Sequence, residues 1–92
     1  MITSFKHKGL EKFFLTGSKA GIQPKHAIKL ADQLFALNRA KRPRDMDFEG
    51  WFLHPLQGKL EGHWAVWVNG NWRLTFRFSD ADAEVVDYQD YH

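Results

Sequence analysis

The sequence contains no cysteine, only three prolines and no long apolar run, and these absences exclude several classes of protein. Without cysteine there can be neither disulfide bonds nor thiolate zinc sites. No stretch is long enough to span a membrane, and the first residues lack the apolar segment of a signal peptide. We therefore expect no membrane association. The net charge of +2 gives only a mild preference for an acidic partner.

The chain does have enough apolar residues for one core. It has 92 residues, of which 43% are hydrophobic and 15% aromatic. A domain of this size can fold on such a core without disulfide or metal crosslinks. We therefore expect a single domain covering residues 1–92.

Helical periodicity dominates the first part of the chain. Residues 8–16 place Leu10, Phe13 and Phe14 on one face, and Gly17 is a typical C-cap. A second helix should begin near Pro24 and end near Asn38. Its core face should consist of Ala27, Leu30, Ala31, Leu34 and Leu37. We expect Lys25, Lys29, Asp32 and Gln33 in water, and His26 at the surface without a function.

Strict alternation predicts a β-hairpin in residues 62–78. A three-residue loop, Asn69 to Asn71, would pair Val68 with Trp72 and align the apolar stripes of the two strands. Trp64 and Trp72 should then face the core, with His63, Arg73, Thr75 and Arg77 on the other face. Residues 83–88 should add a third strand. The fold class predicted is α+β, with two N-terminal helices packed on one face of an antiparallel β-sheet whose other face is partly open.

The candidate catalytic residues are His54, Arg73, Asp90, Tyr91 and His92. Metal-free RNA cleavage requires a base for the ribose 2′-OH, an acid for the 5′ oxygen and a cation for the phosphoryl oxygens. Histidine and carboxylate groups provide the proton transfers, and arginine provides a planar cation. The sequence leaves open which of His54, Asp90 and His92 is the base.

Two alternatives compete with this interpretation. A metal site made from His54, His63, Asp90 and His92 is chemically possible, but the chain has no ligand spacing typical of one. A non-catalytic module could also bind RNA or protein with the same basic face.

Several residues outside the catalytic set are candidates for RNA binding. Lys41, Arg42 and Arg44 form either a solvated loop or an edge that binds phosphates. Trp67 is the better placed tryptophan for stacking, and Arg77 lies on the same face of the predicted sheet.

The chain resembles the HigB-type toxins of the RelE superfamily over nearly its full length. The resemblance is carried by residues 4–10, by Leu53-His54-Pro55-Leu56 with Gly58, and by Asn71-Trp72-Arg73. Gly62 with Trp64, Thr75-Phe76, and the closing Tyr88 with Asp90-Tyr91-His92 complete the set.

The resemblance implies a microbial RNase-like fold and ribosome-dependent cleavage of messenger RNA in the bacterial cytoplasm, without a cofactor. It places His54, Arg73, Asp90, Tyr91 and His92 in the active site. It also implies three partners: the 70S ribosome, its message, and a HigA-type antitoxin whose helix-turn-helix domain binds operator DNA. Toxins of the family carry a lysine where this chain has Gln57, so one contact with RNA phosphate would lose its charge.

Overall fold

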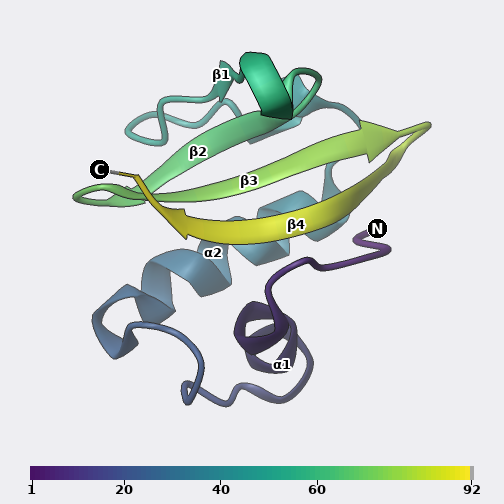
Figure 1. The fold of residues 1–92 in the computed structure, drawn as a ribbon. Coiled ribbons are helices and arrows are strands. Elements are labelled where there is room, and N and C mark those ends of the chain that lie inside the picture. The colour runs from purple at the N-terminus through teal and green to yellow at the C-terminus, as the bar shows by residue number, and fades with distance from the viewer. Residues whose placement is uncertain (92) are drawn as a thin grey trace.

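Two helices lie on one face of a four-stranded antiparallel sheet with strand order β1-β2-β3-β4 (Figure 1). The structure is a computed structural model that describes residues 1–91. The helices are α1 (Lys8–Thr16) and α2 (Ala27–Arg39), and the strands are β1 (His54–Pro55), β2 (Trp64–Asn69), β3 (Trp72–Ser79) and β4 (Asp82–Asp90). Three 3₁₀ turns, η1 (Pro24–His26), η2 (Pro43–Met46) and η3 (Gly58–Leu60), connect them. The predicted α+β class is confirmed. Within residues 1–91, every helix is too short or too polar to cross a bilayer.

Helix α1 begins and ends as the sequence indicates. The Nδ1 atom of His7 accepts a hydrogen bond from the backbone N–H of Leu10 at 2.9 Å, which caps the first turn. Gly17 ends the helix with φ +82°, a left-handed conformation that glycine adopts without steric cost. Leu10 and Phe13 are buried and attach the helix to the core.

Helix α2 packs on the sheet through the expected leucines. Leu30, Leu34 and Leu37 are almost completely buried. Ala31, which was assigned to the same face, is exposed, so that assignment was wrong. Ala31 lies beyond the edge of the buried stripe, which consists of Ala27, Leu30, Gln33, Leu34 and Leu37.

The predictions for two polar residues of this segment were also wrong. His26 and Gln33, both expected in water, are 1% and 0% exposed. Each has a hydrogen-bond partner far away in the sequence. The Nδ1 atom of His26 lies 2.6 Å from the hydroxyl of Tyr88, and the amide of Gln33 donates to the carbonyl of Trp67 at 2.8 Å. Such partners make burial of polar groups tolerable.

The hairpin has the predicted register along most of its length. Trp64 pairs with Phe76 and Val66 with Leu74, so the apolar stripes of β2 and β3 are aligned. The predicted loop was one residue too long, because Asn69 itself pairs with Trp72 and only residues 70–71 form the turn. A bulge between Trp67 and Asn69 absorbs the extra residue and keeps both stripes on the core face. Trp64 and Trp72 pack against the core but stay partly exposed.

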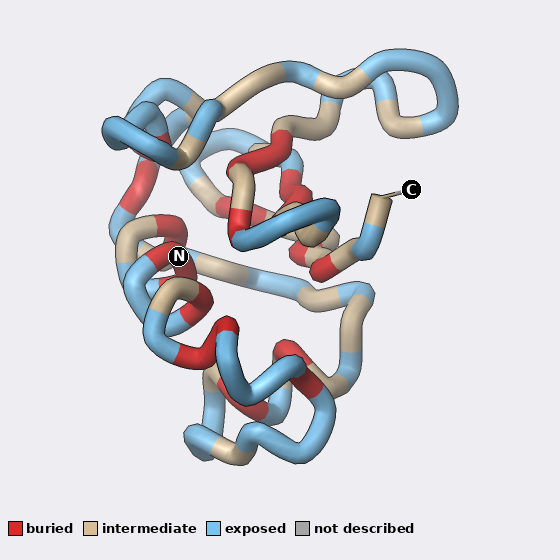
Figure 2. Tube along the Cα trace, turned by 90° about the vertical axis from the view of Figure 1, so that its left-hand side faces the viewer, coloured by how far each residue is buried: buried red, intermediate tan, exposed pale blue. Residues whose placement is uncertain are grey.

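The first residues of the chain cover one edge of the sheet, and β1 forms the other edge. The first residues run along β4 in parallel, with bridges from Ile2 to Ala83 and from Phe5 to Val86. At the other edge, the segment that carries β1 pairs with β2 and lies on the side of the sheet away from the helices (Figure 1). Figure 2 shows buried positions concentrated between the sheet and the helices, while the connections are largely exposed.

Candidate active site

The turn between β2 and β3 organises the site. The carbonyl oxygen of Gly70 accepts two hydrogen bonds, one from the indole Nε1 of Trp67 at 2.9 Å and one from Nη1 of Arg73 at 3.2 Å. The same Nη1 also donates to the carbonyl of Trp72 at 3.1 Å. Trp67 and Arg73 are register partners, so they leave the sheet on one face. The guanidinium is thereby held in one position, and within residues 1–91 the carbonyls of Gly70 and Trp72 are its hydrogen-bond acceptors.

Tyr91 is attached to the same turn. Its backbone N–H donates to the carbonyl of Asn71 at 2.7 Å, and the Arg73 Cζ lies 5.8 Å from the centre of its ring. Burial raises the pKa of the Tyr91 phenol and Asp87 adds to this, while Arg73 opposes it. The phenol is therefore neutral near pH 7 and can donate a hydrogen bond.

His54 lies on the same face but two strands away. It pairs with Ala65, which pairs with Thr75, and alternation puts this row on the face that carries Trp67 and Arg73. Two strand spacings and an offset of two residues along β3 separate the backbones of His54 and Arg73 by about 12 Å. A substrate phosphate between the two side chains would bridge this distance.

The hydrogen bond of His54 determines its tautomer. The Nδ1 atom lies 2.8 Å from the carbonyl oxygen of Phe52, which can only accept. Nδ1 must therefore carry the proton, and in the neutral ring Nε2 has a free lone pair. The side chain is half-buried, so Nε2 can reach a ligand.

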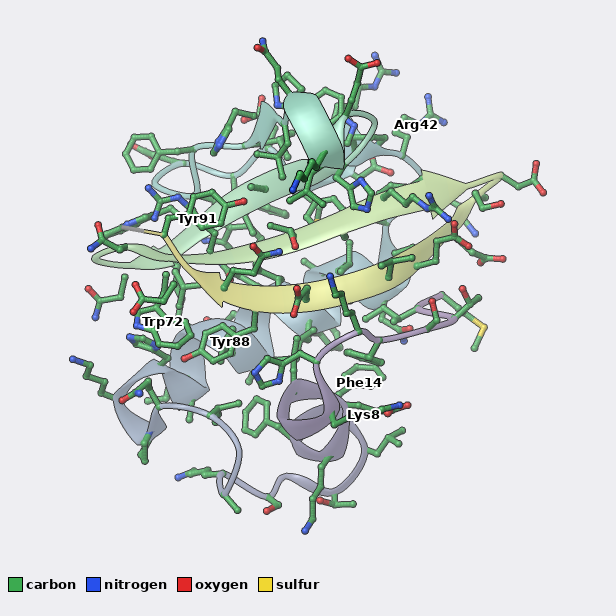
Figure 3. All side chains as sticks on the ribbon, in the orientation of Figure 1. Lys8, Phe14, Arg42, Trp72, Tyr88 and Tyr91 are labelled. Carbon is green, nitrogen blue, oxygen red and sulfur yellow. The ribbon has the colours of Figure 1, made fainter. Side chains whose placement is uncertain are left out.

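Asp90 reaches the same end of the sheet from the opposite face. It pairs with Trp72, one position away from the pair of Arg73 and Gln89. Burial raises the pKa of Tyr88, a hydrogen bond from the Gln23 N–H lowers it, and the charge of Asp90 raises it. Figure 3 shows Tyr91 on one side of the sheet and both Trp72 and Tyr88 on the helix side. The register therefore does not bring Asp90 beside Arg73. His92, the last predicted catalytic residue, lies outside the described residues.

The predicted RNA-binding residues are spread more widely. Gln57 is exposed directly after β1, close in sequence to His54. Arg42 and Arg44 line an open cavity of about 410 Å³ together with Pro43 and Trp64, and Lys41 is an exposed neighbour. Figure 3 shows Arg42 at the opposite end of the sheet from Tyr91. Arg77 is engaged in an ion pair, with its Nε 2.6 Å from a carboxylate oxygen of Glu84.

The geometry of residues 1–91 does not support the metal site considered from the sequence. Within residues 1–91, no three histidine or carboxylate side chains lie close enough to share an ion. The Nδ1 atom of His63, one of the four candidate ligands, is buried and makes no hydrogen bond to any described residue.

Two residues near the site were missed in the sequence. His26 belongs to a buried aromatic cluster with Trp72 and Tyr88, whose rings stack at 4.4 Å. Its spacing of four residues from Leu30 places it on the core face, a signal that was available. Phe52, whose carbonyl holds His54, gave no signal because neither its exposure nor its backbone conformation is visible in the residue type.

Comparisons with known proteins identify the family. Residues 3–92 match the family model described as a RelE-like toxin of type II toxin–antitoxin system HigB. The chain is 40% identical to a Proteus vulgaris protein named Endoribonuclease HigB, over the full length of both. A crystal structure of a YafQ variant from E. coli has the same fold, with a TM-score of 0.55 and 18% identity over 98% of this chain and 91% of that one. As the motifs indicated, the chain belongs to the HigB-like family of RelE-like toxins of type II toxin–antitoxin systems.

Proposed function

We propose that this protein is an endoribonuclease toxin that cleaves messenger RNA at the decoding site of the ribosome and so blocks translation. Its family and the name of its Proteus vulgaris relative support ribonuclease activity. The observation that carries the proposal is the arrangement on the helix-free face. There the Gly70 carbonyl fixes Arg73, Tyr91 lies beside the guanidinium, and His54 presents Nε2.

His54 is the general base in this mechanism. Because Nδ1 donates to the Phe52 carbonyl, Nε2 can take the proton of the ribose 2′-OH. The 2′ oxygen then attacks the adjacent phosphorus, the bond from phosphorus to the 5′ oxygen breaks, and a 2′,3′-cyclic phosphate forms. The 5′ oxygen gains the proton that the second residue of the acid–base pair supplies.

Arg73 and Tyr91 stabilise the phosphoryl group as negative charge develops. The guanidinium is anchored by two carbonyls, so it needs little reorganisation during the reaction. The neutral phenol of Tyr91 donates a hydrogen bond to a phosphoryl oxygen. We assign the proton for the leaving oxygen to His92. Asp90 pairs with Trp72 on the opposite face from Arg73, so it has no proton transfer in this mechanism. In this mechanism side chains make both proton transfers and stabilise the charge on the phosphoryl group, and no divalent ion takes part.

The ribosome orders the substrate. A single-stranded message must be splayed and stacked before its backbone can be cut, and ordering it has a free-energy cost. A programmed ribosome already holds the message in a fixed shape, walled by ribosomal RNA phosphates. Lys41, Arg42 and Arg44 are exposed and would contact those phosphates. Gln57 would contribute a hydrogen bond but no charge.

A toxin of this family has an antitoxin partner. We propose a HigA-type antitoxin, whose helix-turn-helix domain connects the complex to operator DNA, in a bacterial cytoplasm. Expression of the toxin alone should then arrest growth, and co-expression of its antitoxin should relieve the arrest.

The decisive experiment compares one message, naked and bound in a programmed 70S ribosome, at equal toxin concentration. We expect rapid cleavage at the decoding site and little cleavage of naked message. Equal rates on both substrates would identify an independent ribonuclease. Binding to ribosomes without any cleavage would identify a non-catalytic binding module instead.

A further inference from the structure

Phe52 is held with its ring in solvent beside the candidate active site. The side chain is 67% exposed. Its backbone has φ +51°, a left-handed conformation that is a genuine outlier for a bulky residue. An exposed phenylalanine is not unusual by itself. An exposed phenylalanine held in a strained conformation between functional groups is a candidate for a binding role.

The residue connects His54 with Trp67. Its carbonyl accepts the Nδ1 hydrogen bond of His54 at 2.8 Å. Its ring meets the ring of Trp67 edge to face, with centres 5.9 Å apart and planes inclined at 76°. The two aromatic residues thus occupy the face between the proposed base and the proposed phosphate-binding arginine.

Trp67 is fixed in place, and cations flank it. Its Nε1 donates to the Gly70 carbonyl that also holds Arg73. The ammonium of Lys29 lies 5.5 Å from the centre of its ring. A flat apolar surface bordered by positive charge is the combination that binds a single-stranded nucleic acid, because bases stack on aromatic rings while cations hold the backbone.

We infer that Phe52, supported by Trp67, is the stacking platform for the nucleobase next to the scissile phosphate. This inference rests on the proposed function and extends it to a binding residue. Stacking orients the ribose so that its 2′-OH faces Nε2 of His54. Phe52 thus has two separate roles, since the carbonyl orients the base and the ring positions the substrate.

The two roles can be separated by substitution. Phe52→Leu keeps an apolar side chain and the carbonyl but removes the aromatic face. Phe52→Gly removes the side chain and relieves the left-handed conformation, so it should not lower Tm. Phe52→Tyr keeps the ring. Phe35→Leu is the matched control, because Phe35 is equally exposed, at 66%, but lies on α2.

Single-turnover cleavage on programmed ribosomes should show the effect in the maximal rate. We expect Phe52→Leu and Phe52→Gly to lower it by roughly 5- to 150-fold, the effect of losing one base stack. The toxin concentration at half-maximal rate should change little, since phosphate contacts dominate binding to the ribosome. Phe52→Tyr and Phe35→Leu should cleave at nearly the wild-type rate. The pH profile should not shift in any variant, because the carbonyl that orients His54 is retained.

A message with an abasic nucleotide tests stacking directly. An abasic site is placed on either side of the scissile bond in turn. At the stacked position it should slow the wild-type protein to the rate of Phe52→Leu and should not slow that variant further. A wild-type rate for Phe52→Leu would overturn the inference, as would full additivity of the two losses.

Crosslinking separates failure of this inference from failure of the proposed function. A message with 5-iodouridine at the decoding site is irradiated in the toxin–ribosome complex, whether or not the wild-type protein cleaves it. A crosslink at Phe52 or Trp67 supports the platform even if catalysis is absent. Crosslinks confined to other residues overturn the platform even if the message is cut.

Discussion

Replacing Tyr88 by phenylalanine should lower the free energy of unfolding by about 1–3 kcal/mol, the usual cost of leaving a buried polar group unpaired. The Tyr88 side chain is only 4% exposed, and its hydroxyl lies 2.6 Å from Nδ1 of the buried His26. The backbone N–H of Gln23 also donates to this hydroxyl, at 3.4 Å. Removing one oxygen therefore leaves two groups without a partner and adds no compensating contact.

Thermal and urea unfolding measure this loss. For a domain of this size each kcal/mol lowers Tm by roughly 4–8 °C, so we expect a decrease of about 4–24 °C. Tyr91→Phe is the matched control. The Tyr91 hydroxyl makes no hydrogen bond to any described residue. The substitution should therefore change the free energy of unfolding by no more than about 0.5 kcal/mol, with a correspondingly small change in Tm.

A double-mutant cycle tests the cause. His26→Leu removes the other partner, so the double variant His26→Leu/Tyr88→Phe leaves no unpaired group between them. Its loss should be smaller than the sum of the two single losses by about 0.5–3 kcal/mol. An unchanged Tm for Tyr88→Phe, or additive losses in the double variant, would refute the assignment of this pair as a stabilising hydrogen bond.

Three further predictions concern pH, catalysis and ribosome binding. Burial, with a smaller contribution from Lys25, lowers the pKa of His26 below its ordinary value of 6.5. The unfolded chain therefore binds more protons below that pH, so stability should be full above pH 6.5 and decrease as the pH falls toward the folded-state pKa. His26→Gln should reduce the difference in Tm between pH 7.5 and pH 5.5, and an equal difference in both proteins would contradict this. Arg73→Lys should keep the fold but lower the cleavage rate on ribosomes by at least tenfold, because an ammonium cannot reproduce the planar donor set that the Gly70 carbonyl orients; full activity would remove Arg73 from the mechanism. Arg42→Ala/Arg44→Ala should weaken ribosome binding and reduce its salt dependence by about two counterions, with the maximal rate retained; an unchanged salt slope in a binding titration would exclude both residues from the interface.

The helices and the sheet could be predicted because periodicity determines which side chains are buried. The apolar stripes of β2 and β3 had to face the same core, and this requirement gave the correct pairing of Trp64 with Phe76. The length of the turn could not be obtained in this way. A bulge at the end of β2 and a longer loop both preserve the stripes, so the sequence pattern does not distinguish them.

Buried polar residues were the main error, and the reason is their distant partners. His26 is paired with a hydroxyl 62 residues away, and the Nε2 group of Gln33 donates to a carbonyl 34 residues away. A polar residue without a visible partner is reasonably assigned to the surface. Only the tertiary structure reveals that each has a partner in the core.

The candidate site was predicted in part. Its histidine, arginine and tyrosine were chosen from their chemistry and from the family resemblance, and the structure places His54, Arg73 and Tyr91 on one face. It places Asp90 on the opposite pleat, which the sequence did not suggest. The pairing of β4 with β3 determines the face of the sheet on which Asp90 lies. This pairing shifts at a bulge between Thr75 and Arg77, so simple alternation along β4 does not predict the face.

The turn at residues 70–71 explains why these groups converge at all. Trp67 and Arg73 flank this turn and Tyr91 follows β4, and the carbonyls of Gly70 and Asn71 accept hydrogen bonds from all three residues. Gly70 has φ +57°, a conformation that is costly for most side chains. The tight turn therefore requires glycine, and it orients the carbonyl that fixes both the arginine and the tryptophan. The hairpin turn therefore determines where Trp67, Arg73 and Tyr91 are positioned on the helix-free face.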